Sequence, residues 1–411
     1  MRSNSELDLV PLGQLPPLGQ VPRRMYAQTI RSSRFGPPRH AFQREIVQIP
    51  SLEPDEVLVA VMAAAVNFNN VWAAKGFPLD VIKNRRARGA VEDFHIGGSD
   101  GAGIIYQVGS QVSNWNVGDE VVIHGGVWDE NDPWIMQGGD PMLSSTVQAW
   151  GFETNWGSFA QFCKVKHRQC LRKPSRLTWP EAASYMVSAM TAYRMLHHWQ
   201  PNTVKPGDVV LVWGGAGGLG SFAIQLARQA GGIPVAVVNS EEKGRYCMEM
   251  GAAGFIDRRN FDHWGPLTQD INDVDVFNDW CKKVRAFGKA LWAITGKGNN
   301  PKIVIEHPGQ DTLPTSLFLC DTGGMVVTCA GTTGYLGSID LRFLWIRQKR
   351  VQGSHIANDE EAILVNDLIE QGLLKCSPSK VFDFDEVGEA HQLLSDNRHP
   401  PGKMCISVGP V

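Results

Sequence analysis

One segment near the middle of the chain constrains the fold more than any other. An apolar run, Val209–Trp213, is followed at once by a glycine-rich turn with the spacing GxGxxG at Gly215, Gly217 and Gly220. Continuous apolar sequence is typical of a strand buried on both faces of a parallel sheet. Residues 221–230 then show the periodicity of an amphipathic helix. The segment therefore predicts the strand–turn–helix unit of a doubly wound α/β fold.

The rest of the second half repeats this alternation. Segments long enough to form crossover helices separate the strand-like runs, which predicts a parallel sheet. Residues 258–300 are longer than one crossover requires, so we expect an insertion there, with its own helix around residues 287–295. We assign residues 186–356 to this Rossmann-type domain. Its further expected strands are Ile233–Val238, Gly254–Asp257, Lys302–Glu306, Met325–Ala330 and Arg350–Ile356.

The first half of the chain has a different pattern. From Tyr26 to about Pro174, short β-like runs are separated by Gly and Asn, as in an antiparallel, partly barrel-shaped unit. We assign residues 25–185 and 357–411 to this second domain, because the end of the chain is expected to return to it. Residues 1–24 are rich in Pro, Gly and Leu without periodicity, and are predicted to form a flexible arm.

The glycine turn is a predicted dinucleotide site. Glycines allow a tight turn and a close approach of a pyrophosphate to the backbone N–H groups, and the helix N-terminus stabilises its negative charge. The alternative is a glycine-rich packing turn that binds no ligand. The residues expected to bind the cofactor here are Gly215, Gly217, Gly218, Leu219 and Gly220.

The end of the second strand favours NADPH over NADH. An acidic residue there would repel a 2′-phosphate. The sequence instead has Ser240 and Lys243, with Arg258 after the third strand, and a hydroxyl with nearby cations suits a phosphate. Glu241 and Glu242 run against this interpretation unless they point to solvent from the first helical turn.

Composition excludes several function classes. The chain has 39 Lys and Arg against 42 Asp and Glu, a net charge of -3, so no global field attracts nucleic acid or an anionic membrane. No signal peptide or membrane-length apolar run is evident, and we expect a cytoplasmic protein. Eight cysteines without a CxxC pair, together with isolated His95 and adjacent His197 and His198, do not form a zinc ligand set, so no metal is predicted.

Four further segments carry a resemblance to a known family: Val66–Trp72, Trp150–Asn155, Ile305–Gly309 and Gly353–Asn358. With them the chain resembles, from about Arg24 to its end, the crotonyl-CoA carboxylase/reductases and their longer-chain 2-enoyl-CoA relatives. These belong to the medium-chain dehydrogenase/reductase superfamily. The resemblance implies a GroES-like catalytic domain beside the Rossmann domain, a zinc-independent reaction with NADPH, and a homo-oligomer.

The resemblance also implies a reaction and a site. In the family, hydride transfer to Cβ of a 2-enoyl-CoA creates an enolate, whose α-carbon attacks CO2 to give an alkylmalonyl-CoA. Such products serve polyketide assembly or carbon assimilation. The family's CO2 pocket matches Asn69, Phe152, Glu153 and His355 here. Asn69 and His355 can donate hydrogen bonds to CO2. Phe152 can supply an apolar wall or its backbone N–H, and Glu153 can orient His355 or a water.

Each of these residues also has a structural interpretation. Asn69 could satisfy a turn backbone, Phe152 could belong to the core, Glu153 could cap a helix, and His355 could be a buried core histidine. Glu306–His307 is expected to shape the nicotinamide pocket. The alternative functions are an NADPH-dependent enoyl-thioester or quinone reductase that does not carboxylate, and a non-catalytic NADPH-binding protein.

Overall fold

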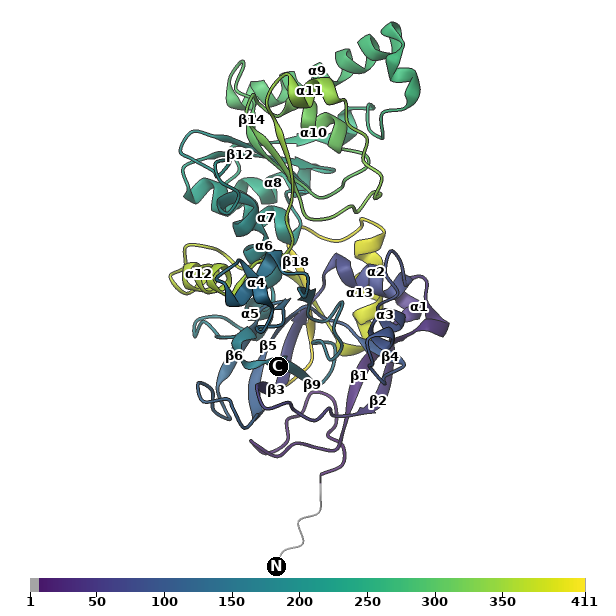
Figure 1. The fold of residues 1–411 in the computed structure, drawn as a ribbon, viewed down its shortest axis with the longest axis vertical. Helices are drawn as coiled ribbons and strands as arrows, with labels where there is room; N and C mark the ends of the chain where they lie inside the picture. The colour runs from purple at the N-terminus through teal and green to yellow at the C-terminus, as the bar shows by residue number, and fades with distance from the viewer. Residues whose placement is uncertain (1–6, 411) are drawn as a thin grey trace, which may run out of the picture. The chain divides into compact units, whose positions relative to one another are not determined.

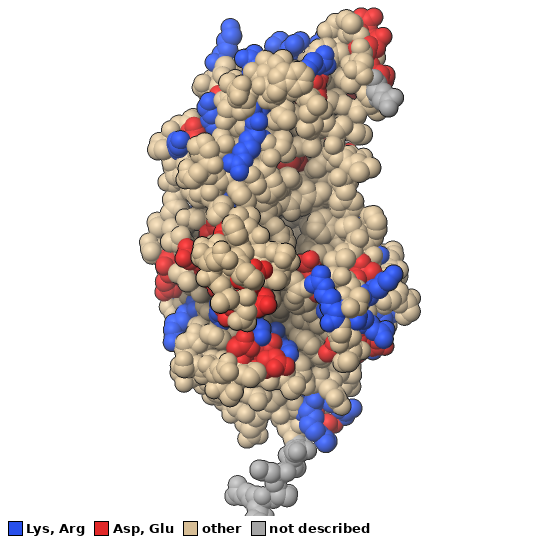
Figure 2. Space-filling model, viewed as in Figure 1, with Lys and Arg blue, Asp and Glu red and all other residues tan. Residues whose placement is uncertain are grey.

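The computed structural model describes residues 7–410, and the chain divides into two units. The first unit comprises Met1–Val187, Asn358–Gly372 and Cys376–Val411, and the second comprises Ser188–Ala357 and Leu373–Lys375. Figure 1 shows the elements of both units with their labels. On the face drawn in Figure 2, basic and acidic side chains both occur on each unit.

The first unit is built on antiparallel strands. Its largest sheet has seven strands in the order β10-β6-β5-β3-β18-β17, with β9 also paired to β3, and a second sheet has the order β2-β1-β4. The strands are β1 Arg24–Arg31, β2 Gln43–Gln48, β3 Glu56–Ala65, β4 Phe94–Ile96, β5 Asp100–Val108, β6 Glu120–Ile123, β7 Gly126–Val127, β8 Gln148–Ala149, β9 Phe162–Lys166, β10 Cys170–Arg172, β17 Pro378–Phe382 and β18 Lys403–Ser407. This arrangement confirms the predicted β-rich domain.

The strand β3 lies at the centre of this sheet. All ten of its residues are buried, because β5 and β9 pair along it and helices cover it. β18, from the end of the chain, pairs antiparallel with it, so the expected return of the C-terminal segment is confirmed. α13 likewise packs beside α1 and α2 (Figure 1). The helices are α1 Pro38–Ala41, α2 Phe68–Lys75, α3 Val81–Ala87, α4 Pro133–Met136, α5 Trp179–Ala183, α12 Asp359–Glu370 and α13 Val387–Ser395.

The described part of the N-terminal segment packs against this unit. The hydroxyl of Tyr106 donates to the carbonyl of Pro16 at 2.9 Å, and the amide of Gln161 donates to that of Val10 at 3.1 Å. Leu15 and Val21 pack against one of the unit's apolar clusters. Residues 7–23 are therefore held against the first unit, whereas the sequence predicts a flexible arm. The reason is that carbonyl groups of this segment accept hydrogen bonds from the unit, and its apolar side chains pack against the unit's apolar cluster. Residues 1–6 lie outside the described part of the chain.

The second unit is a doubly wound parallel sheet. Its six strands have the order β13-β12-β11-β14-β15-β16, and every neighbouring pair is parallel. Figure 1 shows its helices around the sheet. The elements are α6 Met186–His197, β11 Val209–Trp213, α7 Gly218–Gln229, β12 Ile233–Val238, α8 Glu241–Glu249, β13 Gly254–Asp257, α9 Val274–Thr295, β14 Pro301–Glu306, α10 Leu313–Leu319, β15 Met325–Thr328, α11 Leu341–Trp345 and β16 Arg350–Gly353.

The predicted Rossmann strands are confirmed, with the last three shifted by one to three residues at their ends. The structure of residues 258–300 differs from the predicted insertion with a helix of its own around residues 287–295. Its helix, α9, begins at Val274 and is itself the crossover between β13 and β14. Phe287 of α9 stacks on Trp213 with ring centroids 5.8 Å apart, which makes α9 a cover of the sheet's core. The additional residues are those before it, which form two short 3-10 turns.

Candidate active site and cofactor-binding edge

The glycine turn between β11 and α7 is so tightly packed that side chains would not fit at two of its glycines. A Cβ on Gly220 would lie 2.4 Å from the carbonyl oxygen of Gly214, and one on Gly215 would lie 2.7 Å from the Cβ of Ala236. Gly217 is the N-cap of α7, and no side chain among residues 7–410 caps this helix through a hydrogen bond. The N–H groups of the first helical turn can therefore bind a ligand, which fits the pyrophosphate of a dinucleotide.

The ends of β12 and β13 bring the predicted phosphate ligands to one edge. These strands are parallel neighbours, so Ser240 and Arg258, which follow them, lie at the same edge of the sheet. The hydroxyl of Ser240 caps α8 by accepting the backbone N–H of Lys243 at 3.2 Å. Burial lowers the pKa of Lys243, while the Glu242 carboxylate acts in the opposite direction. A bound phosphate would favour the charged ammonium.

A buried carboxylate lies at the end of β14, on the same carboxyl edge. One oxygen of Glu306 accepts the hydroxyl of Thr312 at 2.6 Å and the backbone N–H of Gly309 at 3.0 Å. The other accepts the hydroxyl of Ser316 at 2.5 Å, which in turn accepts the indole N–H of Trp213 at 2.8 Å. Burial raises the pKa of Glu306 to about 7, against these hydrogen bonds. The network holds the loop after β14 to the end of β11.

His307 lies against the glycine turn itself. Its Nε2–H donates to the carbonyl of Trp213 at 3.0 Å. A Cβ on Gly214, whose φ is +58°, would lie 2.4 Å from that nitrogen. Gly214 is thus needed for the approach of His307 as well as for the backbone conformation. The position of Glu306–His307 at a strand end predicts a role in shaping the nicotinamide pocket, but it does not predict the partners Thr312 and Ser316 of Glu306.

In the first unit, the start of α2 presents three asparagines to the turn between β4 and β5. The amide of Asn69 donates from Nδ2 to the hydroxyl of Ser99 at 2.8 Å, and its Oδ1 accepts Nδ2 of Asn70 at 2.9 Å. Asn70 is fully buried, and its Oδ1 accepts the backbone N–H of Gly98 at 3.2 Å. Asn69 itself is only partly buried. The backbone-satisfying role considered for Asn69 thus belongs to Asn70, and Asn69 keeps a side that faces outward.

The turn that carries Phe152 and Glu153 packs on the same β4–β5 segment. A Cβ on Gly151, whose φ is +66°, would lie 2.1 Å from the carbonyl oxygen of Gly98, so the two turns are in close backbone contact. One oxygen of Glu153 accepts the backbone N–H of Ala149 at 2.8 Å. The structure therefore brings the segment of Phe152 and Glu153 and the segment of Asn69 together around residues 97–99.

The backbone N–H of Phe152 is already engaged, whereas its ring is partly exposed. Its N–H donates to the carbonyl of Ala149 at 3.2 Å, so this donor is engaged within the turn. The ring is partly buried, packs against the core and lies 6.4 Å from that of Trp72. Of the two roles expected for Phe152, the apolar wall is the one that its contacts favour.

His355 lies in the second unit, two residues after the end of β16. Its side chain is exposed, which contradicts the alternative of a buried core histidine. The backbone next to it is unusual, because Ile356 has a φ of +45°. A β-branched residue in the left-handed region is an outlier, and such strain accumulates at functional sites.

A buried ion pair supports the asparagine turn, and the sequence did not reveal it. The ammonium of Lys403 on β18 lies 3.2 Å from a carboxylate oxygen of Asp100, and the exposed fractions of these side chains are 7% and 0%. The same oxygen of Asp100 accepts the amide of Asn67 at 2.8 Å, and the other accepts the N–H of Val187 at 2.8 Å. A lysine at the start of an apolar strand was the one available signal.

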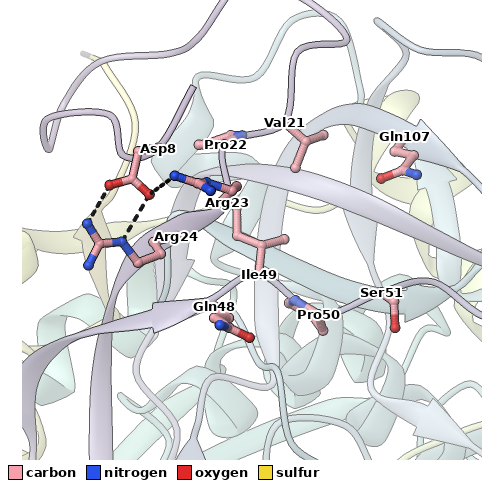
Figure 3. A pocket seen from close by; sticks show the side chains of 10 residues that line it. All are labelled: Asp8, Val21, Pro22, Arg23, Arg24, Gln48, Ile49, Pro50, Ser51 and Gln107. Carbon is pink, nitrogen blue, oxygen red and sulfur yellow. Dashed lines mark hydrogen bonds and ion pairs between the residues drawn. The ribbon is translucent and has the colours of Figure 1, made fainter. Parts of the chain in front are cut away.

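Three further observations concern the described residues as a whole. No group of three or more His, Cys, Asp and Glu side chains among residues 7–410 is placed to hold a metal ion, and no helix among them is long and apolar enough to cross a membrane. Figure 3 shows an open depression where Asp8 pairs with Arg23 and Arg24. It contains none of the predicted site residues. Its lining is Asp8, Val21, Pro22, Arg23, Arg24, Gln48, Ile49, Pro50, Ser51 and Gln107.

Two family models match the chain. The alcohol dehydrogenase GroES-like domain matches residues 53–175, and the zinc-binding dehydrogenase family matches residues 218–371. Among curated proteins, the crotonyl-CoA carboxylase/reductase of Cereibacter sphaeroides is 47% identical over 98% of this chain and 91% of its own. The crotonyl-CoA reductase of Streptomyces avermitilis is 38% identical over 92% of this chain and 85% of its own.

Solved structures agree with these matches. The crotonyl-CoA carboxylase/reductase AntE in complex with NADP is 55% identical, with a TM-score of 0.93 and coverage of 98% of both chains. The 2-octenoyl-CoA carboxylase reductase CinF, in complex with NADP and 2-octenoyl-CoA, is 36% identical, with a TM-score of 0.85 over 94% of this chain and 88% of that one. The chain belongs to the crotonyl-CoA carboxylase/reductase family, within the medium-chain dehydrogenase/reductase superfamily.

Proposed function

We propose that the protein is an NADPH-dependent oxidoreductase that reduces and carboxylates a 2-enoyl-CoA. The observation that carries this function is the 47% identity, over 98% of the chain, with a crotonyl-CoA carboxylase/reductase. The reaction consumes one enoyl thioester, one CO2 and one NADPH, and yields an alkylmalonyl-CoA carboxylate and NADP⁺. A hydride forms the new C–H bond at Cβ, and the electron pair of the former double bond forms the new C–C bond from Cα to CO2.

The described residues fit NADPH at the edge of the parallel sheet. NADPH, when bound, supplies the hydride. Residues 215–220 offer the glycine cradle for its pyrophosphate, as the close backbone approaches at Gly215 and Gly220 indicate. Ser240, Lys243 and Arg258 are proposed to bind its 2′-phosphate. Among residues 7–410 the hydroxyl of Ser240 is engaged only as an acceptor, by the N–H of Lys243, so its own hydrogen is available for donation.

Asn69 is the proposed donor to CO2 in the first unit. CO2 is uncharged and carries partial negative charge on its oxygens, so it requires a donor rather than a strong cation. Of the two hydrogens on Nδ2 of Asn69, one points to Ser99, and no second partner is found among residues 7–410. The ring of Phe152 supplies an apolar wall nearby.

Glu153 is the remaining proposed member of the pocket in the first unit. Glu153 uses one carboxylate oxygen on its own turn, which fixes the side chain and leaves the other oxygen to orient a donor. His355 is assigned to the same reaction by resemblance to the family alone, as a donor through a ring N–H. Exclusion of loose water is part of the function, because protonation of the enolate at Cα would give the saturated acyl-CoA instead of the carboxylated product.

The test follows NADPH oxidation with crotonyl-CoA and with 2-octenoyl-CoA, each with and without bicarbonate plus carbonic anhydrase. Products are weighed by mass spectrometry. We expect an added carboxyl group whenever CO2 is supplied, and the faster substrate identifies the preferred chain length. If only the saturated acyl-CoA forms at saturating CO2, the protein is a plain enoyl-thioester reductase.

A variant links this activity to the site. Asn69→Ala removes the proposed donor, and we expect the KM for CO2 to rise by about tenfold, the equivalent of roughly 1.4 kcal/mol for one hydrogen bond. The control is Asn114→Ala, which truncates an exposed asparagine. An unchanged KM for CO2 in Asn69→Ala would remove this residue from the proposed pocket. Assembly into a homo-oligomer and a cytoplasmic location remain predictions.

A further inference from the structure

Asn70 occupies a position where its side-chain amide has little freedom. It lies in the first turn of α2 and is fully buried. A Cβ on Gly97 would lie 1.9 Å from Oδ1 of Asn70, so the amide sits directly against the backbone of the β4–β5 turn. The missing side chain of Gly97 is what makes room for it.

A backbone group determines which way this amide points. The N–H of Gly98 can only donate, so the atom of Asn70 that lies 3.2 Å from it must be the oxygen. Nδ2 of Asn70 then points to Asn69, and the atom of Asn69 that lies 2.9 Å from it must be an acceptor, Oδ1. The backbone N–H of Gly98 therefore determines which atom is oxygen and which is nitrogen in both amide groups.

The orientation of Asn69 follows in turn. With Oδ1 held by Asn70, Nδ2 of Asn69 donates one N–H to Ser99 at 2.8 Å, and its second N–H has no partner among residues 7–410. Ser99 does not choose between the two orientations, because a hydroxyl accepts from an NH2 group and donates to a carbonyl equally well. Asn70 is therefore the residue that decides whether Asn69 presents a donor or an acceptor.

We propose that Asn70 is a positioning residue for carboxylation, which holds the Asn69 amide with its N–H group turned toward CO2. This inference rests on the proposed role of Asn69. A flipped amide would place a carbonyl oxygen against the partial negative charge on a CO2 oxygen. Asn70 never touches CO2 itself, and its effect passes through the single hydrogen bond to Asn69.

Two substitutions separate this role from packing. Asn70→Asp keeps the shape and the acceptor for Gly98 but replaces the donor to Asn69 with a second acceptor, so Asn69 is expected to flip. Asn70→Ala removes the hydrogen bond to Asn69, so both orientations of the Asn69 amide become possible. The fraction of molecules whose Asn69 N–H is turned toward CO2 then falls by about half. We expect the KM for CO2 to rise roughly fivefold or more in Asn70→Asp and about twofold in Asn70→Ala. A role in packing alone predicts the reverse order, because Asp conserves the volume.

The experiment measures the KM for CO2 and the ratio of alkylmalonyl-CoA to saturated acyl-CoA on the full-length protein. Thermal midpoints, the Kd for NADPH and the KM for the enoyl-CoA establish that each variant is folded. Asn114→Asp makes the same chemical change at an exposed site and is expected to behave as the unsubstituted protein. A folded Asn70→Asp with an unchanged KM for CO2 and product ratio overturns the inference.

Two further outcomes are decisive. If Asn70→Asp does not fold, Asn70→Ala decides, and an unchanged KM for CO2 in that variant overturns the positioning role. If Asn69→Ala also leaves the KM for CO2 unchanged, the proposed pocket is wrong and Asn70 has nothing to position. If Asn69→Ala raises the KM for CO2 but Asn70→Asp does not, the positioning role of Asn70 is refuted and the proposed role of Asn69 stands.

Discussion

The two candidate binding regions of this protein differ in the groups that form them, which are backbone in one region and side chains in the other. At the cofactor edge of the second unit, the turn after β11 is backbone, and its shape depends on missing side chains, as at Gly214 and Gly220. Around Asn69 in the first unit, the proposed binding group is a side-chain amide held by Asn70 on the same helix and by Ser99 about 30 residues away. A backbone site is encoded locally, whereas a side-chain site depends on contacts distant in sequence. The two regions should therefore fail in different ways.

The largest effect is expected where a buried charge supports the asparagine turn. Lys403→Met removes the counter-charge of Asp100, whose side chain is fully buried, and breaking such a pair costs about 3–5 kcal/mol. The thermal midpoint should fall by roughly 10 °C. Lys83→Met, at an exposed position on α3, is the control and should leave the midpoint nearly unchanged. A fall no larger than that of the control would show that side chains do not hold this region together.

The cofactor edge contains a buried carboxyl group, Glu306, which makes the stability of the folded protein depend on pH. Because the pKa of Glu306 is raised from 4.5 to about 7 in the folded protein, its contribution to stability is present below pH 4.5 and is lost as the pH rises through 7. The full loss is about 3 kcal/mol. Glu306→Gln should flatten this part of the pH profile, measured as thermal midpoints between pH 5 and pH 8. Glu249→Gln, at an exposed helix end, should retain the slope of the unsubstituted protein.

The glycine turn should be sensitive to a single methyl group. In Gly220→Ala the new Cβ would lie 2.4 Å from the carbonyl oxygen of Gly214, so the helix start must move away from the cradle. We expect the Kd for NADPH to rise by about 100-fold, equivalent to about 2.7 kcal/mol. Calorimetric titration measures it. The matched control is Gly288→Ala on α9, where the nearest atom is the end of the Leu319 side chain at 3.1 Å. Equal affinity in both variants would contradict a backbone-built site.

The smallest expected effect tests the choice of cofactor. Lys243→Ala removes a partly buried ammonium from the proposed 2′-phosphate site, and the Kd for NADPH should rise roughly tenfold, or about 1.4 kcal/mol. The Kd for NADH should not change, because NADH lacks this phosphate. Lys282→Ala, exposed on α9, serves as the control. A parallel loss for both nucleotides would show that Lys243 acts on the fold of the edge and not on the phosphate.

The second unit could be predicted from the sequence in detail. Its central strands β11 and β12 are almost entirely buried, so they are continuous apolar runs in the sequence. These two strands and β13 have the predicted bounds. The helix α9 was predicted too short, because the start of a long amphipathic helix carries few core residues and buries most of them later, at Phe287 and Leu291. Tertiary packing of that face defines the crossover.

The first unit could be predicted as β-rich, but its site could not be derived from local pattern. Asn69, Phe152 and Glu153 were identified through resemblance to a family, and their assignment to a CO2 pocket stays a prediction. Nothing in the spacing of residues 67–70 shows that Asn70 turns inward to Gly98, or that Lys403 lies beside Asp100. These contacts join segments that are about 30 to 300 residues apart, which no periodicity encodes.

The sequence by itself therefore determined the doubly wound sheet, the glycine cradle and the family to which the chain belongs. These features depend on hydrophobic periodicity and on residues next to one another in the chain, where backbone geometry follows directly from residue type. Only the tertiary structure decided which asparagine faces outward and which is held by the backbone. A side-chain amide has two orientations of similar shape, and the choice between them rests on donors brought to it by the fold.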